Sequence, residues 1–512
     1  MNTANQKQRL SRALLYSLLF GLAAHGLGLT NVIAFHDNVH YFFSVGATYS
    51  SGRWFLGVLG SLFTRFFGAP NCASPLFNGL ICLILSGLSA WVLAEILDVR
   101  SRSGLLLLSG LLVASPAVAG LFGYMFTAPY YLLAQLLCLS AAWVCRRRPD
   151  ALGAGAGGFL LALSIGIYQS YLPMGLCALL LAFAQELCRD EDSRARALLL
   201  RVARYAGTAI GGFLLYFLFN RLFLHLKGAA LDDYMGISQM GQNGLLPYIR
   251  RIPAAYHQFF FPGDGVWNVD LFPDNVRVLY YLCQILMAAL WLPLIWKLLR
   301  ASAAKGICIA LVLLCYPLAA NLIYVMCGTY NEMHLLMVCS LIMVFVPLPF
   351  LAEHTVLPRP GKKAVQRICA AALALVCLSY VRFDNFAHTR MAVYQTRSIE
   401  FFNRMVLRIE STEGYSPELP VAYVGDCPNV ETFQAVPGFD RDPLTPLLSH
   451  ETFLCSYSWQ EFVSFWCGFS PAEADPAAFR DNVEVAAMPC YPADGSIRII
   501  GGTVVVKLSN DN

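Results

Sequence analysis

Residues 13–35 read ALLYSLLFGLAAHGLGLTNVIAF, an apolar run without Asp, Glu, Lys or Arg. A transmembrane helix needs about 20 mostly apolar residues, so this run is long enough to cross a bilayer. Lys7, Arg9 and Arg12 precede it, as basic residues precede the apolar region of a signal peptide, but the run is long enough to span and lacks an Ala-x-Ala cleavage site. We therefore expect an uncleaved first transmembrane helix.

The composition extends this interpretation to most of the chain. Of its 512 residues, 57% are hydrophobic and 13% are charged, and the mean hydropathy is +0.56. One water-soluble core cannot bury so much apolar surface, which indicates an α-helical polytopic membrane protein. The net charge of +4 is small for this length and gives no sign of a nucleic-acid partner.

Eleven apolar segments are predicted to span the membrane: 13–35, 75–97, 104–122, 127–145, 151–168, 171–188, 205–226, 277–299, 306–327, 333–352 and 364–382. Pro116 and Pro129 are expected to kink or shorten their helices. Tyr168 to Tyr171 divide one long apolar stretch into two spans.

The distribution of Lys and Arg predicts the orientation, because cytoplasmic loops collect these residues. They gather in alternate loops: Lys7, Arg9 and Arg12; Arg100 and Arg102; Arg146 to Arg148; Arg189, Arg194, Arg196, Arg201 and Arg204; Lys297, Arg300 and Lys305; Arg359, Lys362, Lys363 and Arg367. The intervening turns at 123–126, 169–170 and 328–332 carry none. A cytoplasmic N-terminus then places segments 36–74, 227–276 and everything after about 383 outside.

The residues after about 383 have a different composition, with charges and prolines in place of apolar blocks. We expect a transmembrane domain over 1–383 and a small soluble α+β domain over 384–512. An amphipathic helix is predicted over 395–411, and strands over Val421 to Val424 and Arg498 to Leu508, the last broken at Gly501-Gly502.

The predicted soluble domain has an even number of cysteines, which allows two disulfides in an oxidising compartment or four reduced thiols. They are Cys427, Cys455, Cys467 and Cys490. Three pairings are open for the disulfides. No pair of cysteines in the chain has zinc-ribbon spacing.

The first outer loop, with FHDNVHYFFSVGATYSSGRW at 35–54, carries the strongest candidates for chemistry. Asp37 at the outer end of a span can stay charged cheaply and act as a general base, with His36 or His40 orienting it. The alternative is that Asp37 or Asn38 caps a helix beginning near Val39.

Arg53 opens an expected interfacial helix whose narrow polar stripe also includes Gly57, Ser61, Thr64 and Arg65. A guanidinium at this level can hold a lipid-linked phosphate bidentately. The alternative is a snorkelling arginine that anchors the helix.

Weaker candidates lie in the other outer segments. Tyr168 and Gln169 form one polar break and Glu332 and His334 belong to another, and either could line a cavity or be satisfied helix-end residues. Loop 227–276 places His257, Asp264 and other acids among aromatic residues, a composition that suits carbohydrate but also an interfacial aromatic belt. The sequence contains no P-loop, dinucleotide fingerprint or HExxH motif, and no clear inverted repeat.

These short motifs carry a family resemblance. His36-Asp37-Asn38 after the first span, then Tyr49 to Trp54 (YSSGRW) and Ile167 to Gln169, resemble bacterial membrane glucosyltransferases of the glucosyl transferase II family. That family is similar to the GT-C superfamily of integral-membrane glycosyltransferases. The resemblance covers roughly residues 10–385.

The resemblance implies an inverting transfer of a sugar, typically glucose, from a polyprenyl phosphate such as undecaprenyl phosphate to a cell-surface glycan. It implies the bacterial cytoplasmic membrane, with the reaction on the outer face. Asp37 would be the base and Arg53 would hold the donor phosphate. Asn38 stands where the family often has a second acid, so a two-carboxylate metal site is not expected, although a divalent metal remains possible.

Two other functions fit parts of the pattern. A transporter or flippase of lipid-linked saccharides also needs many spans, but it is expected to carry charges within them, and few are predicted there. A non-catalytic scaffold could instead use residues 385–512 to bind a cell-wall polymer.

Overall fold

The computed structural model describes residues 3–189, 194–232, 245–262, 274–326, 335–426 and 453–510. The chain folds into two compact units. Unit 1 contains Met1–Val32 and Phe43–Ala387, and unit 2 contains Ile33–Phe42, His388–Pro443 and Leu448–Asn512.

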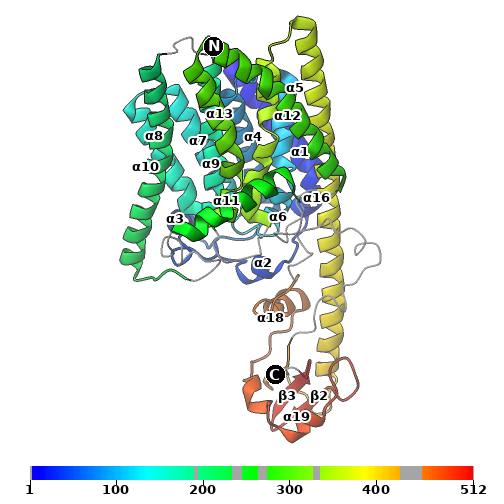
Figure 1. Cartoon of the computed structure of the whole chain (residues 1–512). Coiled ribbons are helices and arrows are strands. Elements are labelled where there is room, and N and C mark those ends of the chain that lie inside the picture. Colours follow the sequence, from blue (N-terminus) through cyan, green and yellow to red (C-terminus); the bar gives the residue numbers. More distant parts are fainter. Residues whose placement is uncertain are drawn as a thin grey trace. The chain divides into compact units, whose positions relative to one another are not determined.

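Unit 1 is a bundle of helices that lie side by side (Figure 1). In chain order they are α1 (Thr3–Thr30), α3 (Trp54–Phe67), α4 (Pro75–Ile96), α5 (Arg102–Val113), α6 (Pro116–Phe122), α7 (Ala128–Arg147), α8 (Ala151–Ile167), η1 (Gln169–Tyr171), α9 (Leu172–Arg189), α10 (Ala195–Lys227), α11 (Leu245–Phe260), α12 (Asp274–Ala301), α13 (Ala303–Ala320), α14 (Leu322–Met326), η3 (Leu335–Val344), α15 (Pro347–His354) and the first part of α16 (Arg359–Glu410).

Within the described residues, nine helical segments are long and apolar enough to cross a membrane. The bent pair of α5 and α6 makes up to ten, and α8, with 17 residues, is shorter than these. Every one of the predicted spans overlaps a helix. The chain is therefore a polytopic helical membrane protein.

Prolines and small residues shape the bundle as their chemistry predicts. Between Val113 and Pro116 the helix bends by 45°, because Pro116 cannot continue the hydrogen-bond ladder of α5. Helices α8 and α10 pack closely: a Cβ on Gly212 would lie 2.9 Å from the carbonyl oxygen of Gly158. Such small-residue contacts are typical of helix interfaces in membranes.

Two sequence expectations are wrong in detail. Segment 227–276 is not simply a loop, since it contains the 16-residue helix α11. The predicted span 364–382 and helix 395–411 are parts of one 52-residue helix, α16. An acid and an imidazole also lie inside the bundle: Asp384 Oδ2 lies 3.8 Å from His25 Nε2, and both side chains are fully buried.

Unit 2 contains the remaining part of α16 and the elements α2 (His36–His40), β1 (Val421–Val424), α18 (Trp459–Phe462), η4 (Val463–Cys467), η5 (Pro476–Phe479), α19 (Val483–Ala487), β2 (Ile497–Ile500) and β3 (Thr503–Lys507). The sheet order is β1-β3-β2, with β1 parallel and β2 antiparallel to β3. Strands β2 and β3 meet at Gly501-Gly502, both with positive φ, which confirms the break expected there. Val424, Val485, Met488 and Val505 form a small core.

Two features of unit 2 bear on the sequence predictions. Ile33–Phe42 belongs to it, so the loop after the first span packs with residues from the C-terminal part of the chain. The proposed boundary near 383 treats that loop as part of the transmembrane domain. Cys455, Cys467 and Cys490 are free thiols, and Cys427 lies outside the described residues.

Candidate functional site

Asp37 lies in α2, a single short helix of unit 2, and its carboxylate has two close neighbours. Tyr457 Oη donates a hydrogen bond to Asp37 Oδ1 at 2.5 Å, and His36 Nδ1 lies 2.9 Å from the same oxygen. The N-cap of α2 is Phe35, and no side chain caps this helix end. Asp37 therefore does not serve as the cap considered from the sequence. Its side chain is 28% exposed, so a hydroxyl group can reach the carboxylate.

His36 and Tyr457 complete a closed triangle around this carboxylate. His36 is buried, and its Nδ1 lies 2.9 Å from Tyr457 Oη. Burial raises the pKa of Tyr457 above its ordinary value, and the hydrogen bond to Asp37 raises it further. Tyr457 is thus a hydroxyl donor over the whole physiological pH range, and it holds Asp37 in one orientation.

A second acid–imidazole pair lies one helical turn further along. His40 Nδ1 lies 3.1 Å from Glu461 Oε1, and both side chains are exposed. His36 and His40 share a face of α2 because four residues separate them. The ring of His40 also lies 5.5 Å from that of Tyr457. We call His36, Asp37, His40, Tyr457 and Glu461 the Asp37 cluster.

Asn38 has a different position from its neighbours. It is buried, and its Nδ2 donates a hydrogen bond to the carbonyl oxygen of Ile33 at 3.1 Å. Just before α2, the backbone N–H of Ala34 donates to Gln395 Oε1 at 2.6 Å, and Phe35 is fully buried. These contacts fix the entry to α2 and so position Asp37.

Arg53 belongs to unit 1, where it is the N-cap residue of α3. Its guanidinium carbon lies 5.1 Å from the centre of the Tyr168 ring and 6.0 Å from that of Tyr131. Those two rings are stacked on each other, with centroids 4.2 Å apart. Cation–π contacts of this kind hold an arginine by its planar face.

The turn before Arg53 is held by the polar break that the sequence analysis singled out. Gln169 Nε2 donates to the carbonyl oxygen of Ser51 at 2.8 Å, and Tyr216 Oη donates to that of Gly52 at 3.2 Å. Gly52 has φ +69°, and a Cβ there would lie 2.8 Å from both Gln169 Nε2 and Tyr216 Oη. Only glycine fits this turn. The structure thus brings Arg53, Tyr168 and Gln169 together.

The remaining predicted site residues are less informative. His257 lies in α11, with its ring 5.4 Å from that of Phe261. Asp264, Glu332 and His334 lie outside the described residues. Among the residues with described positions, no group of three or more His, Cys, Asp or Glu side chains is arranged to hold a metal ion.

Comparison with known families adds one decisive finding. The family model described as glucosyl transferase GtrII matches residues 26–348. The chain belongs to the GtrII glucosyltransferase family. No curated protein and no solved structure matches it.

The GtrII match includes Asp37, Arg53, Tyr168 and Gln169 but ends before the C-terminal part of unit 2. Tyr457 and Glu461, which contact the two histidines of α2, therefore lie outside the matched region. Neither residue belongs to a sequence motif that predicts a site. Their spacing of four residues, in Tyr457-Ser-Trp-Gln-Glu461, is a weak signal for two side chains on one helical face.

Proposed function

We propose that this GtrII-family protein transfers glucose from a polyprenyl-phosphate donor to a hydroxyl group of a cell-surface glycan, with inversion at the anomeric carbon. The observation that carries the proposal is the Asp37 carboxylate, which is accessible and held in place by Tyr457 and His36. An oriented, accessible carboxylate is what a general base toward a sugar hydroxyl requires.

In the proposed step, Asp37 accepts the proton of the acceptor hydroxyl as its oxygen attacks the anomeric carbon. A new C–O bond forms, and the C–O bond to the lipid phosphate breaks on the opposite face, with the electron pair leaving on the phosphate. Arg53 keeps the role that the family resemblance implies, stabilising this phosphate. The lipid monophosphate leaves with less charge than a nucleotide diphosphate, so the step does not require a divalent metal.

The proposed setting is the bacterial cytoplasmic membrane, with a cytoplasmic N-terminus and Asp37 on the outer face. The alternation of Lys- and Arg-rich loops supports this orientation. Its partners would be the lipid-linked sugar, the glycan acceptor and membrane lipids. The C-terminal residues that contact Asp37 would lie on the outer face as a small α+β domain.

The test is transfer of labelled glucose by the purified full chain in vesicles that contain polyprenyl-phosphate glucose and a surface-glycan acceptor. For Asp37→Asn we expect the rate to fall about 10²- to 10⁴-fold, the usual contribution of a general base. Asp481→Asn provides a matched control, since Asp481 is an exposed aspartate of the same unit.

A folded Asp37→Asn protein that transfers glucose at the wild-type rate would refute the assignment of Asp37. Movement of labelled lipid across the vesicle membrane without formation of a glycosidic bond would instead favour a transporter or flippase. Glycan analysis of cells with and without the gene identifies the acceptor, because one glucose side branch should be lost.

A further inference from the structure

A cavity lined by arginines lies in unit 1, among residues that the proposed reaction does not use. Its volume is about 660 Å³, within the usual range of ligand pockets. Its lining comes from α1, the loop after α4, the end of α7 and the end of α9. Six arginines contribute to it: Arg9, Arg12, Arg100, Arg146, Arg147 and Arg189. We call it the arginine cavity.

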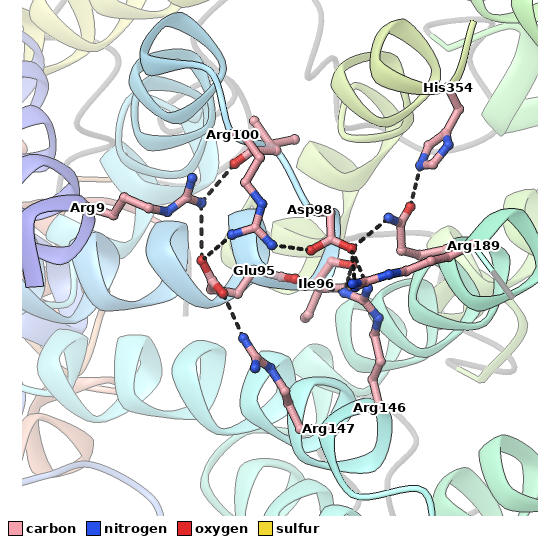
Figure 2. A network of polar contacts seen from close by, with 11 residues as sticks. Arg9, Glu95, Ile96, Asp98, Arg100, Arg146, Arg147, Arg189 and His354 are labelled. Atoms are coloured by element: carbon pink, nitrogen blue, oxygen red, sulfur yellow. Dashed lines mark hydrogen bonds and ion pairs between the residues drawn. The ribbon is translucent and has the colours of Figure 1, made fainter. Parts of the chain in front are cut away.

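Glu95 organises three of these arginines (Figure 2). Its side chain is completely buried, and its carboxylate lies 3.2 Å from Arg9, 3.5 Å from Arg100 and 2.8 Å from Arg147. Helices α1, α4 and α7 and the loop after α4 are thereby joined at one point. The positive groups are held in place before any ligand arrives.

Asp98 organises the other side of the cavity. It contacts Arg100 at 2.5 Å, Arg146 at 2.6 Å and Arg189 at 3.3 Å, and Gln185 Nε2 donates to it at 2.9 Å. Its φ of +51° is unusual for a residue other than glycine. Backbone strain of this kind persists where the surrounding contacts impose it.

The two carboxylates do not balance the arginines. Among the described residues that line the cavity, six guanidinium groups exceed two carboxylates by four charges. Arg12 forms no ion pair with any residue in the described ranges. Arg9 Nε is buried and donates no hydrogen bond to a described acceptor. A bound anion would neutralise part of this positive charge and would accept a hydrogen bond from Arg9 Nε.

We propose that the arginine cavity binds a phosphate group, either on the headgroup of an anionic phospholipid or as free phosphate. The planar fork of a guanidinium matches the oxygens of a phosphate. Basic pockets between transmembrane helices are suited to anionic headgroups. In the orientation proposed above, the cavity is on the cytoplasmic side, so this site is distinct from that of glucosyl transfer.

The test compares the wild-type chain with the double variant Arg12→Gln/Arg189→Gln, which removes two exposed or half-buried charges and leaves Glu95 and its three partners intact. Phosphatidylglycerol and phosphatidylcholine are titrated separately in nanodiscs or mixed micelles and read by native mass spectrometry. Inorganic phosphate is titrated in detergent and read by thermal shift. We expect anion affinity to fall about 30-fold in the double variant, and to fall with added salt.

Arg148→Gln is the matched control, because Arg148 is exposed, pairs with Asp150 and does not line the cavity. The double variant Arg12→Lys/Arg189→Lys keeps the charge and should retain much of the affinity. Binding of phosphatidylglycerol but not phosphate assigns the site to a headgroup, and the reverse assigns it to free phosphate. Equal affinity in the wild type and the Gln variant, or binding of neither anion by the wild type, overturns the proposal.

Discussion

In the Asp37 cluster the central carboxylate contacts a phenol and an imidazole, whereas in the arginine cavity each carboxylate contacts three guanidinium groups. A phenol hydroxyl orients an acid and leaves it able to exchange a proton with an incoming hydroxyl group. Three arginines instead hold an acid in place through ion pairs. The same side-chain type is thus suited to chemistry in one place and to organising positive charge in the other.

The carboxylates of the two sites also differ in their exposure to solvent. The Asp37 side chain is 28% exposed, and the Glu95 side chain is not exposed at all. A general base has to touch its substrate, while a carboxylate that positions arginines works best when water is excluded. The comparison therefore predicts that variants at Asp37 change the rate and variants at Glu95 change the stability.

Glu95→Gln should give the largest effect on stability. Its loss leaves Arg9, Arg100 and Arg147 facing one another without their shared anion, and breaking a buried pair costs about 3–5 kcal/mol. The matched change Glu461→Gln removes an exposed partner of His40 and should cost about 0–1 kcal/mol. Unfolding in mixed detergent–SDS micelles measures the loss of unfolding free energy in both variants. Similar losses for Glu95→Gln and Glu461→Gln would contradict this prediction.

Asp98 should make the arginine cavity sensitive to acid. Burial opposes ionisation, but the charge of Arg146 and the hydrogen bond from Gln185 prevail and lower the pKa of Asp98 to about 2, from 3.8. Because the folded-state pKa is depressed, this group stabilises the fold fully above pH 3.8 and loses that effect as pH falls toward 2.

The measurement is the melting temperature of the wild type and of Asp98→Asn across this pH range. The difference between them should be constant near neutral pH and should shrink between pH 4 and 2. The exposed Asp150→Asn offers a comparison, since Asp150 pairs with Arg148 outside the cavity. A difference that persists unchanged at pH 2 would show that the charge of Asp98 is not what stabilises the loop.

The helical fold could be predicted from sequence because its determinants are local. Apolar runs of sufficient length, the bend at Pro116 and the turn at Gly501-Gly502 each depend on neighbouring residues. The continuity of α16 could not be predicted from the sequence. The charged residues between 382 and 395 resemble a linker, and only the folded structure shows this stretch as helix. Asp384, buried beside His25, is part of that stretch.

The candidate site could be predicted only in part, for a related reason. Asp37 and Arg53 stood out because an acid, two imidazoles and a guanidinium gather in one loop beside a predicted span, and Gln169 because it interrupts a long apolar stretch. That Gln169 holds the turn before Arg53 depends on the packing of η1 against that turn, which no local pattern encodes. Tyr457 was missed because it is a single aromatic residue in an irregular segment. Its hydrogen bond to Asp37 of α2 exists only in the folded protein.

Tyr457→Phe makes the smallest change that we consider, since it removes one oxygen atom. The carboxylate of Asp37 then loses the hydroxyl that fixes its direction, and the transfer rate should fall about 10-fold, equivalent to about 1.4 kcal/mol. Because Tyr457 acts through Asp37, kcat should fall while KM for the donor stays constant.

Tyr415→Phe, at a tyrosine of the same unit outside the Asp37 cluster, is the control. An unchanged rate in Tyr457→Phe would mean that His36 alone orients Asp37, and the Asp37→Asn/Tyr457→Phe double variant would then be no slower than Asp37→Asn. A loss larger than that of Asp37→Asn would instead assign the proton transfer to the phenol, and the comparison of the two clusters would have to be drawn around Tyr457.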